Sequence, residues 1–544
     1  MRRSMIALLA ASVLSLPAQA LARGPVIETV SGPVRGEVQD GVAVFRGLPY
    51  AAPPVGPRRW RPPAPAASWT EVREASQFGA ACPQPPSRPD SIYAARHRAV
   101  SEDCLYLNIW APAGGRDAPV FVWIHGGSLT TGAGSEPMYD GAKLAAQGLV
   151  VVTINYRLGV LGYLAHPELS TESPDGVSGN YGLLDQIAAL RWVQDSIAAF
   201  GGDPANVTVA GESAGALSVM YLMASPTARG LFHKAVAQSA YMISTPELKA
   251  DRHGAPSAES AGVELGRRLE ARSLARLRAM DAQALTIAAA TAGFQPWGTV
   301  DGRVMPRQLV EVFDRGEQAA APVLTGFNEG EIRSLRFLAP PPPESPEAYE
   351  ALIGARYGDL SEDFLRLYPS DDLAASVLAA PRDALYGWTA ERLARSQTAQ
   401  GRDAYLYLFD HGYPTADQLD LHAFHAAEIP YVFGTQGRTP PRWPASPDTP
   451  AERALSAAMM DYWTSFARSG APAVEGGPVW RPYAEDQAYM AFVDAPQPGH
   501  DLMPGMFELN EAVVCRRRKD GTTAWNWNVG VVAPPLPAGG PSCP

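Results

Sequence analysis

A serine flanked by glycines is the first candidate for chemistry in this chain. It is Ser213, in the motif GESAG at 211–215, which follows an apolar run at 207–210 and precedes a helix-like run at 214–223. A G-x-S-x-G motif between a strand and a helix lifts the serine hydroxyl above the end of a sheet, beside the free N–H groups of the helix. A bare match also arises by chance in a long chain, so the rest of the sequence must decide whether Ser213 is a nucleophile.

A glycine-containing turn supplies a candidate oxyanion hole. The sequence HGGS at 125–128 directly follows the strongly apolar run 119–124. Backbone N–H groups in such a turn can point together at one oxygen atom, as a tetrahedral acyl-transfer intermediate requires. We therefore expect the N–H groups of Gly127, Ser128 and Ala214 to form an oxyanion hole. An ordinary strand-ending loop is the alternative.

The elements around these turns alternate between strands and helices. Several runs are continuously apolar, as in strands that are buried on both faces, and 180–200 carries apolar residues on one side of a helix. This order predicts an α/β fold with a large, mostly parallel sheet flanked by helices. The predicted strands are 26–34, 41–45, 119–124, 148–155, 207–210, 321–325 and 405–409, and the predicted helices are 180–200, 214–223, 451–467 and several within 346–395.

Together these motifs resemble the type-B carboxylesterase and cholinesterase family of the α/β-hydrolase fold. The resemblance extends from near residue 45 to near residue 471. It implies an α/β-hydrolase fold whose long insertions form the pocket, and hydrolysis of small-molecule carboxylic esters through a serine, a histidine and a glutamate, with no metal or organic cofactor. The matching segments are FRGLPYAAPPVG, SEDCLYLNIW, WIHGG, GNYGLLDQIAALRWVQDSIAAFGGDPANVTVAGESAG, FHAAEIPYVFG and YWTSFARSGAP.

The resemblance places the general base at His425, in FHAAEIPYVFG at 424–434. A serine hydroxyl needs a base within hydrogen-bond reach, and histidine suits this role because it titrates near neutral pH. His422, three residues earlier, is the rival. A metal site formed by His422 and His425 is a further alternative, although no acidic or cysteine ligands cluster beside them in the sequence.

The acid lies in TGFNEGEIRSL at 325–335, which contains two candidates. Alignment with the family pattern favours Glu331, and we expect Glu329 to be an exposed loop carboxylate. The usual D-E-G of the family is changed here, because Gly330 precedes Glu331. The resemblance also places the hydroxyl of Ser239 near the acid, although a buried capping serine is equally consistent with the sequence.

Two departures from the family pattern bear on the shape of the substrate pocket. Ser128 and Ala426 stand where the family usually has glycine. The side chain of Ser128 would either narrow the space around the ester, which disfavours bulky tertiary-alcohol esters, or add a hydroxyl contact to the substrate. The predicted pocket residues are Leu129, Glu212, Phe327 and Trp388. Trp388 and Tyr386 would contribute aromatic walls from the predicted helices within 346–395, and packing in the protein core is the alternative for both.

Two other functions remain open from the sequence. The same three residues can hydrolyse amides or carbamates, and some members of the family are binding proteins that have lost catalytic residues. The loop between Cys82 and Cys104 contains Tyr93 but no tryptophan, which argues against the quaternary-ammonium site of cholinesterases.

The composition is that of a globular enzyme, with 46% hydrophobic and 19% charged residues among 544. The net charge of -11 excludes a general attraction to nucleic acid or anionic membranes. The one strongly basic run, 516–519, is expected to be solvated at the start of a proline-rich tail. We expect a single catalytic domain over 21–544.

The N-terminus has the pattern of a signal peptide. Arg2 and Arg3 precede an apolar run at 5–16, and Ala18-Gln19-Ala20 offers small residues for cleavage. We predict cleavage after Ala20, with Ala22 as the alternative, and a secreted or periplasmic protein. No later run is long enough to insert stably into a membrane.

Four cysteines are consistent with that compartment, namely Cys82, Cys104, Cys515 and Cys543. Four cysteines allow three pairings, which the sequence alone does not distinguish. Two local loops, 82 with 104 and 515 with 543, are the simplest arrangement. The absence of C-x-x-C spacing argues against a metal site at these cysteines.

Overall fold

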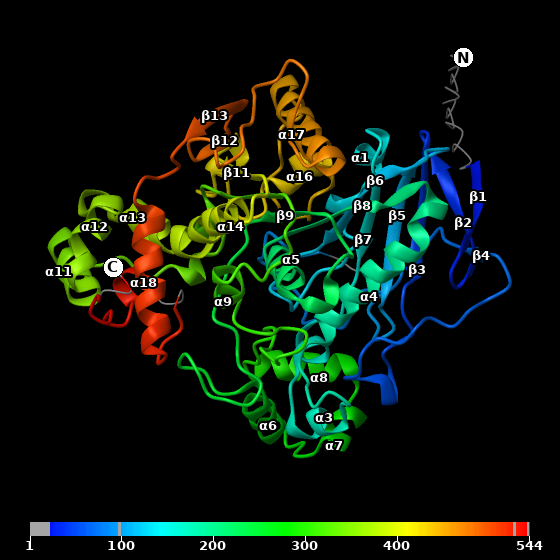
Figure 1. Cartoon of the computed structure of the whole chain (residues 1–544), viewed down its shortest axis with the longest axis horizontal. Helices are drawn as coiled ribbons and strands as arrows, with labels where there is room; N and C mark the ends of the chain where they lie inside the picture. Colours follow the sequence, from blue (N-terminus) through cyan, green and yellow to red (C-terminus); the bar gives the residue numbers. More distant parts are fainter. Residues whose placement is uncertain (1–21, 96–98, 526–528, 541–542, 544) are drawn as a thin grey trace, which may run out of the picture.

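A computed structural model describes residues 22–95, 99–525, 529–540 and 543. The predicted signal peptide, 1–20, lies outside the described residues. Within them, thirteen strands form one sheet in the order β1-β2-β3-β5-β7-β6-β8-β9-β10-β11-β12-β13, with β4 beside β2 (Figure 1). The strands are β1 (Ala22–Thr29), β2 (Gly32–Gln39), β3 (Val42–Pro49), β4 (Arg73–Glu74), β5 (Tyr106–Pro112), β6 (Ala118–Ile124), β7 (Val150–Ile154), β8 (Gly202–Glu212), β9 (Lys234–Gln238), β10 (Val323–Asn328), β11 (Ala404–Phe409), β12 (Ala488–Phe492) and β13 (Pro496–His500).

The centre of the sheet is parallel and its two ends are antiparallel. From β7 through β6 and β8 to β12 every neighbouring pair is parallel. The pairs from β1 through β2, β3 and β5 to β7 are antiparallel, as is the last pair, β12 with β13, whereas the short β4 pairs with β2 in parallel. The large, mostly parallel sheet predicted from the sequence is therefore confirmed.

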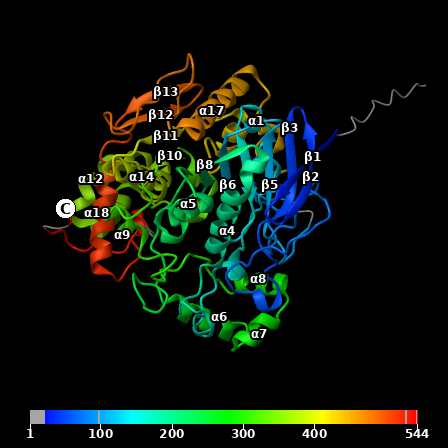
Figure 2. The same cartoon turned by 45° about the vertical axis from the view of Figure 1, so that its right-hand side comes forward.

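Helices cover both faces of this sheet. The α-helices of the described residues are α1 (Ala142–Ala146), α2 (Gly159–Tyr163), α3 (Pro167–Glu172), α4 (Tyr181–Ser196), α5 (Ala214–Ala224), α6 (Ala258–Arg268), α7 (Leu274–Ala279), α8 (Ala282–Thr291), α9 (Leu309–Asp314), α10 (Glu331–Ser334), α11 (Pro346–Tyr357), α12 (Ser361–Leu367), α13 (Leu373–Arg382), α14 (Trp388–Ala399), α15 (Pro414–Asp417), α16 (Ile429–Phe433), α17 (Pro450–Ser469) and α18 (Met506–Asp520). In both views α6 to α8 lie at the bottom of the molecule, whereas α12 and α18 lie beyond the β12–β13 side of the sheet (Figures 1 and 2).

Strand β6 shows how a hydrophobic core arises on each face of the sheet. Val120, Val122 and Ile124 point to one face, where they belong to the same cluster as buried residues of α4, α5 and α14. Phe121 and Trp123 point to the opposite face, toward α1, α16 and α17. Because successive side chains of a strand alternate between faces, an entirely apolar strand is buried on both sides.

Both ends of the chain differ from the sequence-based expectation. The predicted strand 26–34 is two strands, β1 and β2, because the chain turns between Thr29 and Gly32. The prediction that the basic run 516–519 is exposed to solvent is wrong for two of its residues. Helix α18 continues to Asp520, and Arg516 and Arg517 are 3% and 1% exposed. Arg516 forms a bidentate ion pair with Asp359.

The cysteines form the two local loops that the sequence favoured. Disulfides join Cys82 to Cys104 and Cys515 to Cys543. Within the described ranges, no helix combines the length and the apolar character that crossing a bilayer requires.

Candidate active site

The candidate residues meet at the carboxyl end of the central strands, because each of them follows a parallel strand. Ser213 comes directly after β8, Glu331 begins α10 three residues after β10, and His425 lies on the connection after β11. Gly127 belongs to the turn after β6. Neighbouring parallel strands have their carboxyl ends on the same side of the sheet, and open α/β sheets bind their ligands beyond these ends.

Ser213 occupies a strained turn between β8 and α5. Its φ is +56° and its ψ is -120°, outside the conformations that L-residues prefer. The serine N–H donates to the carbonyl of Gln238 in β9, at 2.9 Å, and the side chain makes no capping hydrogen bond to α5. A Cβ atom on Gly215 would lie 2.0 Å from the carbonyl oxygen of Ile124, so the close approach of α5 to β6 requires glycine there.

A cavity of about 540 Å³ opens above Ser213. Ser213, His425, Glu212, Gly127 and Ser128 all line it. Phe337, which is 78% exposed, stands at its wall as well. The remaining walls are strongly aromatic and consist in part of Tyr93, Tyr139, Tyr241, Trp297, Tyr386 and Trp443. A concave, largely apolar space with a few polar groups is the usual form of a small-molecule site.

His425 is oriented by a buried carboxylate. Its Nδ1 is hydrogen-bonded to Glu331, which is completely buried. The other oxygen of Glu331 accepts a hydrogen bond from the N–H of Asn328 at 2.9 Å, so the carboxylate is fixed against β10. No hydrogen bond joins Ser213 to His425 among the described residues, although both line the cavity. Such contacts are often long before substrate binds.

Glu212 adds a second carboxylate beside the same imidazole. One of its oxygens lies 3.1 Å from Nε2 of His425. Burial raises the pKa of Glu212 to about 8. Burial alone would lower the pKa of His425, but the charges of Glu212 and Glu331 outweigh it and raise this pKa to about 9. The two groups therefore titrate as a coupled pair.

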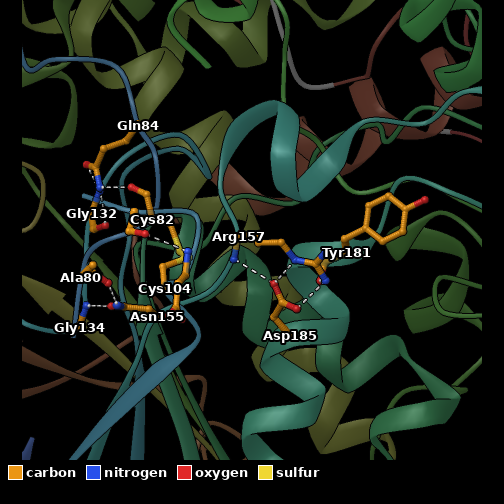
Figure 3. The surroundings of a disulfide bond; sticks show 12 residues. Ala80, Cys82, Gln84, Cys104, Gly132, Gly134, Asn155, Arg157, Tyr181 and Asp185 are labelled. Carbon is orange, nitrogen blue, oxygen red and sulfur yellow. Dashed lines mark hydrogen bonds and ion pairs between the residues drawn. A yellow bond between two sulfur atoms is a disulfide. The ribbon is translucent and has the colours of Figure 1, made fainter. Parts of the chain in front are cut away.

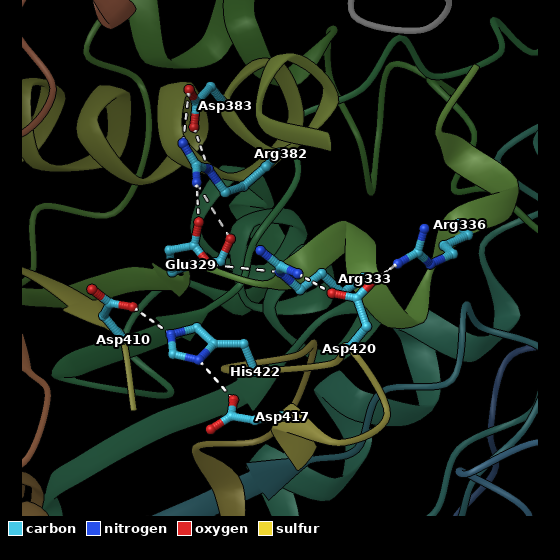
Figure 4. A network of polar contacts seen from close by, with 9 residues as sticks. All are labelled: Glu329, Arg333, Arg336, Arg382, Asp383, Asp410, Asp417, Asp420 and His422. Carbon is cyan, nitrogen blue, oxygen red and sulfur yellow. Dashed lines mark hydrogen bonds and ion pairs between the residues drawn. The ribbon is translucent and has the colours of Figure 1, made fainter. Parts of the chain in front are cut away.

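The rival residues lie in a separate network of ion pairs, shown in Figure 4. Glu329 accepts a hydrogen bond from Arg382 at 3.0 Å. His422 lies 2.9 Å from Asp410 and 3.0 Å from Asp417. Its bond to Asp410 is the main reason that its pKa is raised to about 9. His422 is also absent from the residues that line the cavity above Ser213, whereas His425 is among them.

Acidic groups do gather around His422, contrary to the sequence-based expectation. Glu329, Asp410 and His422 each bring one ligand-type atom within 4.8 Å of the others. However, Glu329 is paired with Arg382, and Asp410 is paired with His422 itself. The carboxylates that could bind a metal ion are therefore already paired with cationic side chains, and His425 does not belong to this group.

The departures from the family pattern have distinct backbone consequences. Ser128 and Ala426 have φ values of +55° and +69°, in the region that favours glycine. Gly330 has an ordinary φ of -91°, but a Cβ atom there would lie 2.7 Å from the carbonyl of Leu421 and 2.9 Å from that of Ala423. Gly330 therefore allows the segment that carries Glu331 to pack directly against the loop that carries His425.

Three residues predicted to line the pocket do not. Leu129, Phe327 and Trp388 are completely buried and contribute nothing to the lining of the cavity. The Trp388 indole donates to Glu511 of α18 at 2.9 Å, away from Ser213. Glu212 and Tyr386 do line the cavity as expected. Sequence reasoning missed Tyr241, Trp297 and Trp443, because insertions far apart in the chain bring them together and no local motif marks them.

Comparisons with known proteins show which family this chain resembles. The model of the carboxylesterase family matches residues 23–504. The chain is 39% identical to a fumonisin B1 esterase of Sphingopyxis macrogoltabida over 461 residues, which are 82% of each protein. It is 36% identical to a para-nitrobenzyl esterase of Bacillus subtilis, covering 86% of this chain and 95% of that protein.

Solved structures give the same result. A PNB esterase superimposes with a TM-score of 0.76 at 34% identity, covering 89% of this chain and 99% of that one. A carboxylesterase of Geobacillus stearothermophilus superimposes with a TM-score of 0.74 at 35% identity and the same coverage.

Proposed function

The chain belongs to the carboxylesterase family and is a carboxylic-ester hydrolase of the α/β-hydrolase fold, and from this premise we propose that Ser213, His425 and Glu331 are its catalytic triad. Ser213 attacks the ester carbonyl while His425 takes its proton. His425 then returns the proton to the leaving alcohol, and water releases the acyl group by the same route. Glu331 keeps the imidazole in the required orientation and stabilises its charged form.

One observation carries this proposal. His425 is held by the buried Glu331 through Nδ1, and it lines the same cavity as Ser213 at the turn before α5. The base, the acid that orients it and the nucleophile thus come from three separate strand ends and are brought to one space. Glu329 and His422, the alternatives, are held by other charges.

The negative charge of the tetrahedral intermediate requires donors on the opposite side of the ester. We assign this role to the N–H groups of Gly127, Ser128 and Ala214. Ala214 is the first residue of α5, where the N–H groups have no partner within the helix. Each donor contributes about 3 kcal/mol to the stabilisation of such an intermediate.

The walls of the cavity favour esters with apolar acyl and alcohol groups, because aromatic side chains make up much of its surface. Hydrolysis of amides or carbamates by the same residues is the second candidate activity. Two disulfides support export to an oxidising compartment, as the signal peptide pattern suggests.

Labelling with a fluorophosphonate tests the proposal. The wild-type protein should bind one equivalent of label at Ser213, and Ser213→Ala should bind none and hydrolyse no ester. Ester, amide and carbamate versions of one apolar substrate then rank the activities. A folded wild-type protein that neither reacts with the label nor hydrolyses any ester would show that the chain is a binding protein instead.

A further inference from the structure

The loop closed by Cys82 and Cys104 forms one wall of the active-site cavity. Gln84, Ser91 and Tyr93 of this loop all line the cavity. Both cysteines are buried, at 2% and 0% exposure, and belong to the main hydrophobic core. The disulfide thus anchors a cavity wall directly to the body of the protein.

One end of this loop is bonded to the turn that carries the proposed oxyanion hole (Figure 3). The amide of Gln84 accepts a hydrogen bond from the N–H of Gly132 at 3.0 Å and donates one to its carbonyl at 3.1 Å. Asn155, at the end of β7, binds the carbonyl of Ala80 and the N–H of Gly134, each at 2.9 Å. These hydrogen bonds therefore fix the start of the disulfide loop relative to the turn after β6.

Tyr93, further along the loop, contacts both segments that hold the base and the acid. Its hydroxyl oxygen lies 2.8 Å from the carbonyl oxygen of His425 and 2.7 Å from the hydroxyl of Ser334. A carbonyl only accepts, so the phenol proton is best placed on the His425 carbonyl, and the Ser334 hydroxyl is free to donate to Tyr93. Ser334 ends the single turn of α10 that Glu331 begins.

The backbone around His425 needs such support. The next residue, Ala426, has a φ of +69°, in the left-handed region that is unfavourable for a residue with a side chain. A strained backbone persists only where surrounding contacts fix it. The ring of Tyr93 is itself held edge-to-face against Trp443, with ring centres 5.8 Å apart.

We propose that Tyr93 is a positioning residue for catalysis. Its hydroxyl binds both the backbone of His425 and the helical turn that carries Glu331, and so keeps these two segments aligned. This inference rests on the proposed triad. It adds the loop between Cys82 and Cys104 to the segments that position the triad residues. Tyr93 reaches neither Ser213 nor the substrate carbonyl in this role. It acts through the position of the imidazole.

Tyr93→Phe tests this, because it keeps the ring and removes only the hydroxyl. With rates normalised to fluorophosphonate-reactive sites, kcat for a small ester should fall roughly 10-fold, while KM should change less than about 2-fold, since a displaced base costs turnover rather than binding. Tyr349→Phe is the matched control, because its hydroxyl also donates to a backbone carbonyl, that of Tyr368, in a remote cluster. This control should leave both constants unchanged.

Ser334→Ala provides a second test that does not alter Tyr93. It should reduce kcat by a smaller factor, and the double variant should be no slower than Tyr93→Phe alone, because both changes break one chain of hydrogen bonds. Unchanged kcat in Tyr93→Phe, or an equal loss in Tyr349→Phe, would overturn the inference. If Tyr93→Phe does not fold, unchanged kcat in Ser334→Ala would overturn it. A wild-type protein that the label does not modify would instead refute the triad.

Discussion

The carboxylate of Glu212 lies 3.1 Å from Nε2 of His425, the ring nitrogen that Glu331 does not bind. The imidazole is therefore placed between two buried carboxylates, and Glu428 adds a third negative charge nearby. A base in this position holds its proton more tightly than an ordinary histidine. It becomes available to Ser213 only as the pH rises through a raised pKa.

Glu212→Gln should move the acid limb of the kcat/KM profile to lower pH by about 1 unit. The carboxylate raises the pKa of His425, so its removal lowers that pKa and frees the base at lower pH. The profile of kcat/KM against pH for an ester without ionisable groups measures the shift. Glu136→Gln is the control, because Glu136 lines the same cavity but does not contribute to the raised pKa of His425. A shift to higher pH would contradict the prediction.

Glu331→Gln should lower kcat by about 10³–10⁴-fold, because an amide no longer stabilises the charged imidazole or fixes its tautomer. Glu329→Gln, two residues away, should retain activity within about 3-fold, since its carboxylate pairs with Arg382 outside the cavity. Steady-state kinetics of the two variants, with circular dichroism to verify folding, distinguishes them. Equal activities would mean that the wrong acid has been identified.

The sequence contains most of what positions the nucleophile, because that information is local. The apolar strand, the glycines at 211 and 215 and the helix after Ser213 are contiguous in the chain. The pairing of Glu331 with His425 was also predictable, although the two are 94 residues apart. In that case a family motif at each position supplied the information that spacing alone does not.

The pocket walls were less predictable, because they depend on packing between insertions. Trp388 is of a residue type that often lines pockets. Its indole instead donates a hydrogen bond to Glu511, on the helix α18 that was not predicted from the sequence. Tyr93 has no motif around it, and its partners lie 241 and 332 residues away. Such contacts follow from how separate segments meet in space and leave no periodic or local signal in the chain.

Ala426→Gly should increase the free energy of unfolding by about 0.5–1 kcal/mol, because glycine tolerates the φ of +69° and the relief exceeds its own entropic cost. Denaturant unfolding measures the change. Ala427→Gly is the control at a neighbouring buried position without positive φ, and it should destabilise the protein by a similar amount. A loss of stability in Ala426→Gly would contradict this account.

Ser128→Gly should raise kcat/KM for a tertiary-alcohol ester relative to a primary-alcohol ester by about 10-fold, which corresponds to about 1.4 kcal/mol. Ser128 lines the cavity within the turn that follows β6, so its side chain occupies space that a bulky alcohol needs. The ratio of the two kcat/KM values isolates shape from general changes in rate. Ser128→Ala is the control and should not raise this ratio, because it retains the Cβ atom. An unchanged ratio in Ser128→Gly would mean that other walls limit the substrate.

The disulfide between Cys82 and Cys104 also has a practical consequence for anyone who prepares the enzyme. None of the cysteines lies in a central strand, so chains made in a reducing cytoplasm can still assemble the sheet. In those chains the loop that carries Gln84 and Tyr93 would lack its covalent anchor. The specific activity of such a preparation would vary with the fraction of oxidised chains, so the disulfide content of each batch should be measured before its kinetics are compared.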